Sequence, residues 1–239
     1  MNTTLSNISI DCVIFGYDTE GLKVLLFEES YQIGSRKIHA LKLPGDHILQ
    51  NETLQQSAER VLYEQTGVRN IFIRQFQVFS DPDRLKHGSI DFESIKSQLP
   101  DKRVITVGFY SLVNISDIKD PISKRACWIN CYEVGRSIFD HNEILDAALE
   151  RLRKELLHHP IAFELLPEKF SLTQLQKLYE AIFNTEFDKR NFRRKIAKMK
   201  YLIPLDEFET GVSHKPARYY SFDREIYETT RRENFDFRL

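Results

Sequence analysis

One ten-residue segment near the middle of the chain limits the folds that the chain can adopt. Residues 104–113, VITVGFYSLV, are largely apolar and rich in β-branched and aromatic side chains. A strand of this composition is typical of the centre of a sheet that is buried on both faces. The sequence therefore predicts a fold built around a buried sheet.

The segments before this strand predict further parts of the same sheet. Two apolar stretches between residues 8 and 29 flank the sequence DTEG, which favours a β-hairpin. Strand-like stretches follow at 38–43 and 71–79. Residues 52–65 predict a helix, because apolar residues recur on one face: Leu54, Ala58, Val61 and Leu62.

A second helix and a change of pattern mark the end of this region. Asp140 can cap a long amphipathic helix that we expect over about 140–158. Two prolines follow, and after Pro167 the pattern changes to two short helices and a hairpin. We therefore expect two domains, 1–166 and 167–239, with the long helix as a linker or dimer helix at the end of the first.

The composition of the chain excludes several classes of protein. The 239 residues carry a net charge of −1 and are 41% hydrophobic, which fits a globular protein rather than a disordered one. No apolar run is long enough to cross a bilayer, so we expect a cytoplasmic protein. Cys12, Cys127 and Cys131 are an odd number and imply reduced thiols rather than a disulfide framework or a metal site. We expect no metal and no cofactor.

The stretch GDHILQNETLQQSAERVLYEQTGV resembles a known catalytic motif, the Nudix box, in which a glycine loop precedes a helix rich in carboxylates. The matching residues are Gly45, Glu52, Arg60, Leu62, Glu64, Gly67 and Val68. Six residues rather than five separate Gly45 from Glu52. Val61 and Gln65 stand where the motif has glutamates.

These two departures remove the charges on which Nudix chemistry depends. The resemblance implies that the box carboxylates bind divalent metal ions, and such hard ions need anionic oxygen ligands. Of the glutamates that the motif has after its arginine, only Glu64 remains. We therefore predict a Nudix-like domain without hydrolase activity, in which Arg60, Glu52 and Gly67 keep a structural role as a salt-bridged loop, helix and loop.

A dense basic segment lies in the second half of the chain. Residues 189–200 contain seven Lys and Arg and no acid. In a helix from Asp188 to Lys200, Phe192, Ile196 and Met199 share one face, and the arginines lie roughly opposite. Two strands joined by ETGVSHKP follow, so that helix, helix and hairpin predict a winged helix-turn-helix.

Such a unit places its second helix in the major groove of DNA and its hairpin along the phosphates. Arg190 and Arg194 are the candidates for guanine contacts. The remaining candidates for DNA contacts are Lys189, Arg193, Lys198, His214, Lys215 and Arg218. A solvated charged surface and an RNA-binding surface are the alternatives, and the second lacks an aromatic stacking platform.

The whole chain resembles the Nudix-related transcriptional regulators typified by repressors of NAD metabolism. The resemblance rests on VIFGYDTEGLKVLL, LPGD, SDPDR, HNEILDAALERLRKEL, IAFELLPEKFSLTQLQKLYEAI, DKRNFRRKIAKM and HKPARYY. It implies an α+β chain with an N-terminal Nudix-like α/β/α sandwich and a C-terminal winged helix-turn-helix. It also implies a homodimer that binds a palindromic operator in double-stranded DNA and whose Nudix-like domain senses ADP-ribose or a sugar.

We expect an effector-responsive regulator rather than an enzyme. Among effectors the sequence favours a neutral pentose such as L-arabinose, because acidic residues around the degenerate box would repel a diphosphate. Lys42, Asp81, Asp83 and Arg84 are the candidate effector contacts, with loop and turn capping as their alternative role. The competing hypotheses are a metal-dependent Nudix hydrolase acting on ADP-ribose-like diphosphates and an adaptor for an acidic protein.

Overall fold

The chain forms two compact units, Met1–Arg151 and Leu152–Leu239. The computed structural model describes residues 4–67, 69, 71–88, 95, 103–118, 125–211, 213 and 215–230. The division falls earlier than the boundary that we predicted after residue 166. The reason is that the segment before Pro167 packs with the second unit, where the rings of Phe163 and Phe222 stack with their centroids 4.3 Å apart.

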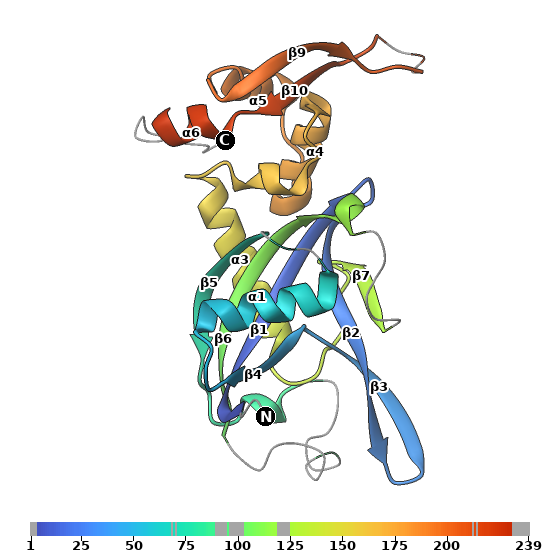
Figure 1. Ribbon diagram of the computed structural model, residues 1–239. Coiled ribbons are helices and arrows are strands. Elements are labelled where there is room, and N and C mark those ends of the chain that lie inside the picture. Colours follow the sequence, from blue (N-terminus) through green and yellow to red (C-terminus); the bar gives the residue numbers. More distant parts are fainter. Residues whose placement is uncertain are drawn as a thin grey trace. The chain divides into compact units, whose positions relative to one another are not determined.

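The first unit is built on one mixed sheet (Figure 1). Its main path runs β3-β2-β1-β6-β5, with β4 paired to β1 and β7 paired to β2. β6 is parallel to β1 and antiparallel to β5, and its residues 106–113 are buried, which confirms the predicted central strand. The strands are β1 (Thr4–Asp18), β2 (Gly21–Ile33), β3 (Arg36–Lys42), β4 (Gly45–Leu49), β5 (Phe72–Phe79), β6 (Ile105–Asn114) and β7 (Ala126–Asn130).

Helix α1 (Leu54–Thr66) lies across one face of this sheet, and α3 (His141–Leu156) starts behind the opposite face (Figure 1). The Thr53 hydroxyl caps α1 by accepting a hydrogen bond from the Gln56 amide, and the Gln56 side chain accepts one from the Thr53 amide. Ala58, Val61 and Leu62 pack in the core as predicted. Leu54, at the first position of the helix, is instead 36% exposed.

Some elements were not predicted from the sequence. They are the short strands β4, β7 and β8 (Phe170–Ser171), the 3-10 turns η3 (Ile115–Asp117) and η4 (Ile161–Leu165), and helix α6 (Arg224–Thr230). A further 3-10 turn, η1 (Arg84–Lys86), lies in the long polar loop after β5. Short elements carry few residues of a hydrophobic period, so their pattern is weak. The cysteines Cys12, Cys127 and Cys131 form no disulfide. None of the helices in the described ranges is long and apolar enough to span a membrane.

The second unit is a small helical domain with a three-stranded sheet of order β8-β10-β9. The Ser171 hydroxyl caps α4, and the buried residues of this helix include Leu175, Leu178 and Tyr179. Helix α4, helix α5 and the β9-β10 hairpin confirm the predicted winged helix-turn-helix. The elements are β8 (Phe170–Ser171), α4 (Leu172–Phe183), α5 (Lys189–Ile196), β9 (Leu202–Phe208) and β10 (Arg218–Phe222).

Helix α5 is shorter than the helix that we predicted from Asp188 to Lys200. Asp188 caps it as expected, because its carboxylate accepts a hydrogen bond of 2.8 Å from the Asn191 amide. The helix ends at Ile196. Beyond it, the amides of Lys198 and Met199 bond three residues back, and the chain turns into β9. Lys198 therefore lies in a turn after the helix rather than on it.

Candidate effector cavity and nucleic-acid interface

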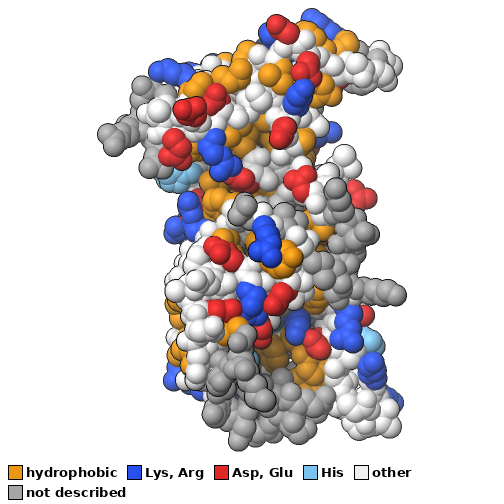
Figure 2. Space-filling view, viewed as in Figure 1, with side chains coloured by type: hydrophobic (Ala, Val, Ile, Leu, Met, Phe, Trp, Pro, Cys, Tyr) orange, Lys and Arg blue, Asp and Glu red, His pale blue; other side chains and the backbone are white. Residues whose placement is uncertain are grey.

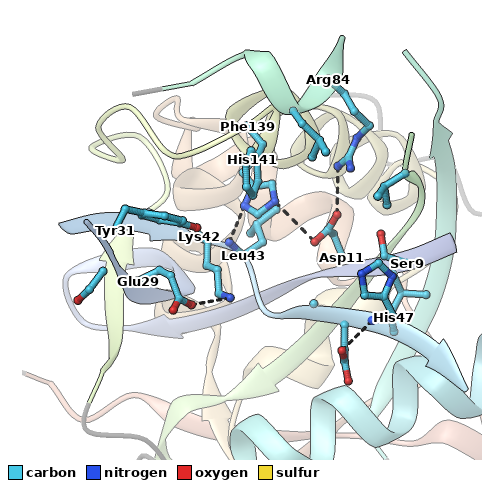
Figure 3. Close-up of a pocket in the computed structure, with 16 residues that line it drawn as sticks. Ser9, Asp11, Glu29, Tyr31, Lys42, Leu43, His47, Arg84, Phe139 and His141 are labelled. Atoms are coloured by element: carbon cyan, nitrogen blue, oxygen red, sulfur yellow. Dashed lines mark hydrogen bonds and ion pairs between the residues drawn. The ribbon is translucent and has the colours of Figure 1, made fainter. Parts of the chain in front are cut away.

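A cavity of about 420 Å³ opens in the first unit, between the sheet and the loops at one of its ends. Figure 3 shows its side chains converging from β1, β2, β3, β4, η1 and the start of α3. We call it the Asp11 cavity. It is lined by Ser9, Ile10, Asp11, Glu29, Ser30, Tyr31, Lys42, Leu43, Gly45, Asp46, His47, Arg84, Leu85, Val104, Phe139 and His141.

Three buried charged side chains form a network at this cavity. The Arg84 guanidinium donates from Nε to Asp140 Oδ2 at 2.8 Å and from Nη2 to Asp140 Oδ1 at 2.7 Å. Arg84 Nη2 also lies 3.3 Å from Asp11 Oδ2. Burial raises the pKa of Asp140, and the charge of Arg84 opposes that shift. One guanidinium thus serves two buried carboxylates.

His141 completes the network, and its hydrogen bonds define its tautomer. Its Nδ1 accepts a hydrogen bond of 2.9 Å from the buried Leu43 amide, so in the neutral ring the proton is on Nε2. Burial lowers the pKa of His141, which favours this neutral form. Nε2 faces Asp11 Oδ1 at 3.6 Å. The cavity therefore presents an N–H donor beside a carboxylate acceptor.

The structure brings two of the four predicted effector residues to the Asp11 cavity. Lys42 lines it and pairs with Glu29 Oε2 at 2.6 Å. Arg84 also lines it, but its guanidinium is held by Asp140 and Asp11. Asp81 and Asp83 do not line it. Asp81 Oδ1 accepts a hydrogen bond from the Asp83 amide, and Asp83 pairs with Lys86, so both aspartates act in the turn.

The sequence reasoning missed Asp11, Tyr31 and His141. Asp11 had one visible signal, since it is the only carboxylate in the otherwise apolar stretch ISIDCVIFGY. Tyr31 had no such signal, because an aromatic residue in a strand is as typical of a packed core as of a binding site. Burial raises the pKa of Tyr31 to about 12, so its hydroxyl keeps its proton and can donate a hydrogen bond.

In the degenerate Nudix box, Arg60, Glu52 and Gly67 have the structural role that we predicted for them. Arg60 Nε donates to Glu52 Oε1 at 2.8 Å, and its Nη1 pairs with Asp46 Oδ2 at 2.8 Å. Burial alone would raise the pKa of Glu52, but hydrogen bonds from Arg60 and from the Leu49 amide lower it. Gly67, at φ 71°, ends the helix in a left-handed conformation.

The two positions that lack a glutamate lie in different surroundings. Val61 is 1% exposed and belongs to the core between α1 and the sheet. Gln65 is partly exposed and lines a separate cavity of about 230 Å³ together with Glu28, Lys42 and Arg125. Within the described residues, no group of three or more His, Cys, Asp and Glu side chains is arranged to hold a metal ion.

Helix α5 presents an exposed basic face, which we define as Lys189, Arg190, Arg193 and Arg194. On its other side, Phe192 and Ile196 are 0% and 1% exposed. Arg194 Nη2 donates to Asn191 Oδ1 at 2.9 Å, which orients the guanidinium along the helix. No carboxylate pairs with this basic face among the residues that the structure describes. Lys198, in the following turn, is exposed as well.

The predicted wing contacts have different surroundings. Lys215 is exposed, as a phosphate contact requires. Arg218 instead donates to the Leu205 carbonyl at 2.6 Å and to Asp206 at 2.7 Å, so it ties β10 to β9. His214 lies outside the described residues.

The excess of positive charge is confined to the basic segment 189–200 and is not a property of the whole chain. On the face shown in Figure 2, Lys and Arg side chains are interspersed with Asp and Glu side chains. The whole chain is nearly neutral, with a net charge of −1. A dense group of cations in such a chain is suited to one anionic partner rather than to general adhesion to polyanions.

Comparisons with known proteins agree with this architecture. Residues 162–222 match the family model of the NrtR DNA-binding winged helix domain. The ADPR responsive transcriptional repressor NtrR of Acinetobacter baylyi is 25% identical over 227 residues, which are 92% of this chain and 84% of the relative.

Solved structures reproduce both units. Shewanella oneidensis NrtR, crystallised with a 27mer DNA, has a TM-score of 0.73 at 23% identity and covers 97% of this chain and 98% of its own. A second crystal structure of that protein has a TM-score of 0.68 at 25% identity, with 90% and 94% covered. A MutT/nudix family protein from Enterococcus faecalis has a TM-score of 0.61 at 23% identity, with 90% and 86% covered.

Each domain thus matches its expected type. The first unit has the fold of a Nudix domain, and the second matches a DNA-binding winged helix by both sequence and structure. Over both units the chain is similar to the Nudix-related, winged-helix transcriptional regulators of the NrtR type.

Proposed function

We propose that this protein is a transcriptional repressor whose affinity for operator DNA depends on a small molecule bound in the Asp11 cavity. The observation that carries the proposal is the exposed basic face of α5. It lies in the position of a recognition helix, inside the segment that matches a DNA-binding winged helix domain. Repression, rather than activation, follows the name of the Acinetobacter relative.

The DNA contacts divide into two kinds. Arg190 and Arg194 lie opposite the buried stripe of α5 and are suited to guanine, because a guanidinium can bond O6 and N7 together. Lys189, Arg193 and Lys198 flank them and meet phosphates, as does Lys215 of the wing. Two copies of this surface in a homodimer would read a palindrome whose half-sites are about one or two helical turns apart.

ADP-ribose is the first candidate for the effector. The Acinetobacter repressor, which aligns over most of both chains, is named as ADPR responsive. The Asp11 cavity, at about 420 Å³, lies in the size range of small-molecule sites. The comparisons give no support to the pentose effector that the sequence favoured.

One observation nevertheless keeps a neutral pentose as the second candidate. The cavity is lined by three carboxylates, on Asp11, Glu29 and Asp46, against two cations, on Lys42 and Arg84. Both cations are already paired with carboxylates. A diphosphate therefore has to compete with these pairs, whereas a neutral sugar such as L-arabinose does not.

Operator binding and release test the proposal directly. Binding to fluorescent DNA duplexes, selected from a random-sequence library, is measured by anisotropy at several salt concentrations. We expect specific binding and its loss in the Arg190→Ala/Arg194→Ala variant, and release by ADP-ribose or by L-arabinose identifies the effector. If the variant bound the selected duplex as tightly as the wild type, the DNA-binding assignment would be wrong. Light scattering of the free protein and of the complex tests the homodimer.

A further inference from the structure

The Asp11 cavity contains a carboxylate whose neighbours do not fully neutralise it. Asp11 lies in strand β1, beside β6, and is 7% exposed. Its one cationic partner among the described residues is Arg84, at 3.3 Å from Oδ2. The same guanidinium makes two shorter bonds, of 2.7 and 2.8 Å, to Asp140. A buried carboxylate in this position favours additional hydrogen-bond donors.

The neighbouring histidine supplies half of a second hydrogen-bonding position. His141 Nε2 carries the proton, because Nδ1 accepts from the Leu43 amide. Its distance of 3.6 Å from Asp11 Oδ1 is longer than an ordinary N–H···O bond. An oxygen placed beside both atoms can lie within hydrogen-bond reach of each. That oxygen has to accept from Nε2 and donate to Oδ1.

A hydroxyl group meets this requirement, and a phosphate oxygen does not. A hydroxyl both accepts and donates, whereas an ionised phosphate only accepts and would be repelled by Asp11. The dashed lines in Figure 3 show that the contacts of Asp11 with Arg84 and His141 are separate from the Lys42 and Glu29 pair. The cavity therefore has one position that suits hydroxyl groups, at Asp11 and His141. A separate position, at the Lys42 ammonium, suits an anionic group.

We propose that Asp11 and His141 form a hydroxyl-binding subsite that recognises the ring hydroxyls of a pentose. The inference rests on the proposed function, because it concerns the effector of the same cavity. Two ligands share this chemistry, the terminal ribose of ADP-ribose and a free pentose. For ADP-ribose the subsite also sets the direction of binding, with the terminal ribose at Asp11 and the diphosphate toward Lys42.

The test compares ligands with and without the pentose. Binding to the full chain is measured by calorimetry and thermal shift with ADP-ribose, with ADP, which lacks the terminal ribose, and with D-ribose and L-arabinose. We expect ADP-ribose to bind at least about tenfold more tightly than ADP, or a free pentose to bind where ADP does not. The reason is that ADP lacks the pentose hydroxyl that donates a hydrogen bond to the charged Asp11 side chain. Equal affinities for ADP-ribose and ADP, without pentose binding, would overturn the subsite, as would binding of none of these ligands.

Variants assign the effect to the two residues. Asp11→Asn and His141→Gln should weaken the pentose-containing ligand by about tenfold or more, while Asp117→Asn, at an exposed carboxylate, should change nothing. Unchanged affinity in folded Asp11→Asn contradicts the proposal. If that variant does not fold, the wild-type comparison of ADP-ribose with ADP and pentoses decides alone.

The outcome is separable from that of the proposed function. Operator binding without any ligand tests the repressor, whereas the calorimetric comparison tests the subsite. Operator binding with equal affinities for ADP-ribose and ADP would remove only the subsite. Pentose binding that depends on Asp11, in a protein without specific DNA binding, would remove only the repressor.

Discussion

Arg84 and Asp140, 56 residues apart in the sequence, form a buried bidentate ion pair with bonds of 2.8 and 2.7 Å. Both side chains are 4% exposed. The pair joins η1 to the residue just before α3. Gly88, at φ 110°, bridges to Ile138 beside it, and a Cβ at Gly88 would lie 2.5 Å from the Phe139 amide nitrogen. One wall of the Asp11 cavity and the start of α3 are thus held together.

Removing one partner of this pair should be costly. We expect Arg84→Met to lower the free energy of unfolding by about 3 to 5 kcal/mol, because it leaves the buried carboxylates of Asp140 and Asp11 without their cation. Asp140→Ala should cost less, because Arg84 keeps its contact with Asp11. The double variant Arg84→Met/Asp140→Leu should be less destabilised than Arg84→Met, because it leaves one buried carboxylate, Asp11, without a cation rather than two. Urea denaturation measures these changes, and Arg36→Met, at an exposed arginine, is the control. Single variants as stable as this control would contradict a buried ion pair.

The buried histidine predicts a dependence of stability on pH. Burial lowers the pKa of His141 in the folded protein below its ordinary value near 6.5. As pH falls through that value, the unfolded chain binds a proton that the folded chain does not, so the free energy of unfolding decreases. His141→Gln should reduce this decrease between pH 7.5 and 5.5.

Urea denaturation at the two pH values measures the difference. His158→Gln, at an exposed histidine, serves as the control. A wild-type protein and a His141→Gln variant with the same pH dependence would show that the imidazole is not held neutral by burial.

The burial of Val61 predicts that replacing it with the glutamate of the Nudix box destabilises the protein. Its side chain is 1% exposed among apolar neighbours that include Ile10 and Phe109. We expect Val61→Glu to destabilise the first unit by several kcal/mol, about 3 or more, since it buries an unpaired carboxylate. Gln65→Glu, at the partly exposed position, should stay near the wild type. Thermal denaturation of the two variants gives the comparison, and equal melting temperatures would contradict the packing of α1.

The same residues predict the absence of hydrolase activity. With Mg²⁺ and ADP-ribose, the wild type should release no AMP above background, because position 61 points an apolar side chain into the core and position 65 carries no charge. Product release is followed by chromatography. Metal-dependent turnover that disappears in Glu64→Gln would instead support the hydrolase hypothesis.

The elements that repeat a pattern could be predicted from the sequence. The spacing of apolar residues predicts the central strand β6, helix α1 and the buried stripe of α5. The start of α5 could be predicted because Asp188 is a typical N-cap residue. The end of α5 could not be predicted in the same way. The periodicity continues through Met199, but the chain leaves the helix after Ile196 to enter β9.

The composition of the cavity could not be predicted, because it depends on contacts between distant residues. The hydrogen bond from Leu43 to His141 spans 98 residues, and that from Arg84 to Asp11 spans 73. The prediction selected charged residues in a polar loop, and two of them, Asp81 and Asp83, act in the turn. Arg218 shows the same difficulty, since a basic residue in the wing predicts a phosphate contact whether or not a neighbouring carboxylate binds it.

The DNA interface gives the last prediction, in which the structure separates residues of similar charge. Arg194→Ala should cost about 1 to 3 kcal/mol of operator binding and reduce the preference over scrambled sequences, because a contact to a base edge is lost. Lys215→Ala should weaken binding to all sequences alike and lower the slope of log affinity against log salt by about one, because a phosphate contact is lost.

Arg218→Ala should differ from both. Its guanidinium holds β10 to Leu205 and Asp206, so the expected loss is in the stability of the second unit, with little change in the salt slope. Lys37→Ala, at an exposed lysine of the first unit, controls for the loss of one charge. Anisotropy titrations against salt, paired with thermal denaturation, distinguish the three outcomes. If Arg218→Ala lowered the salt slope as Lys215→Ala does and left the melting temperature unchanged, then Arg218 would contact phosphate in the complex, and its role in joining the wing strands would be secondary.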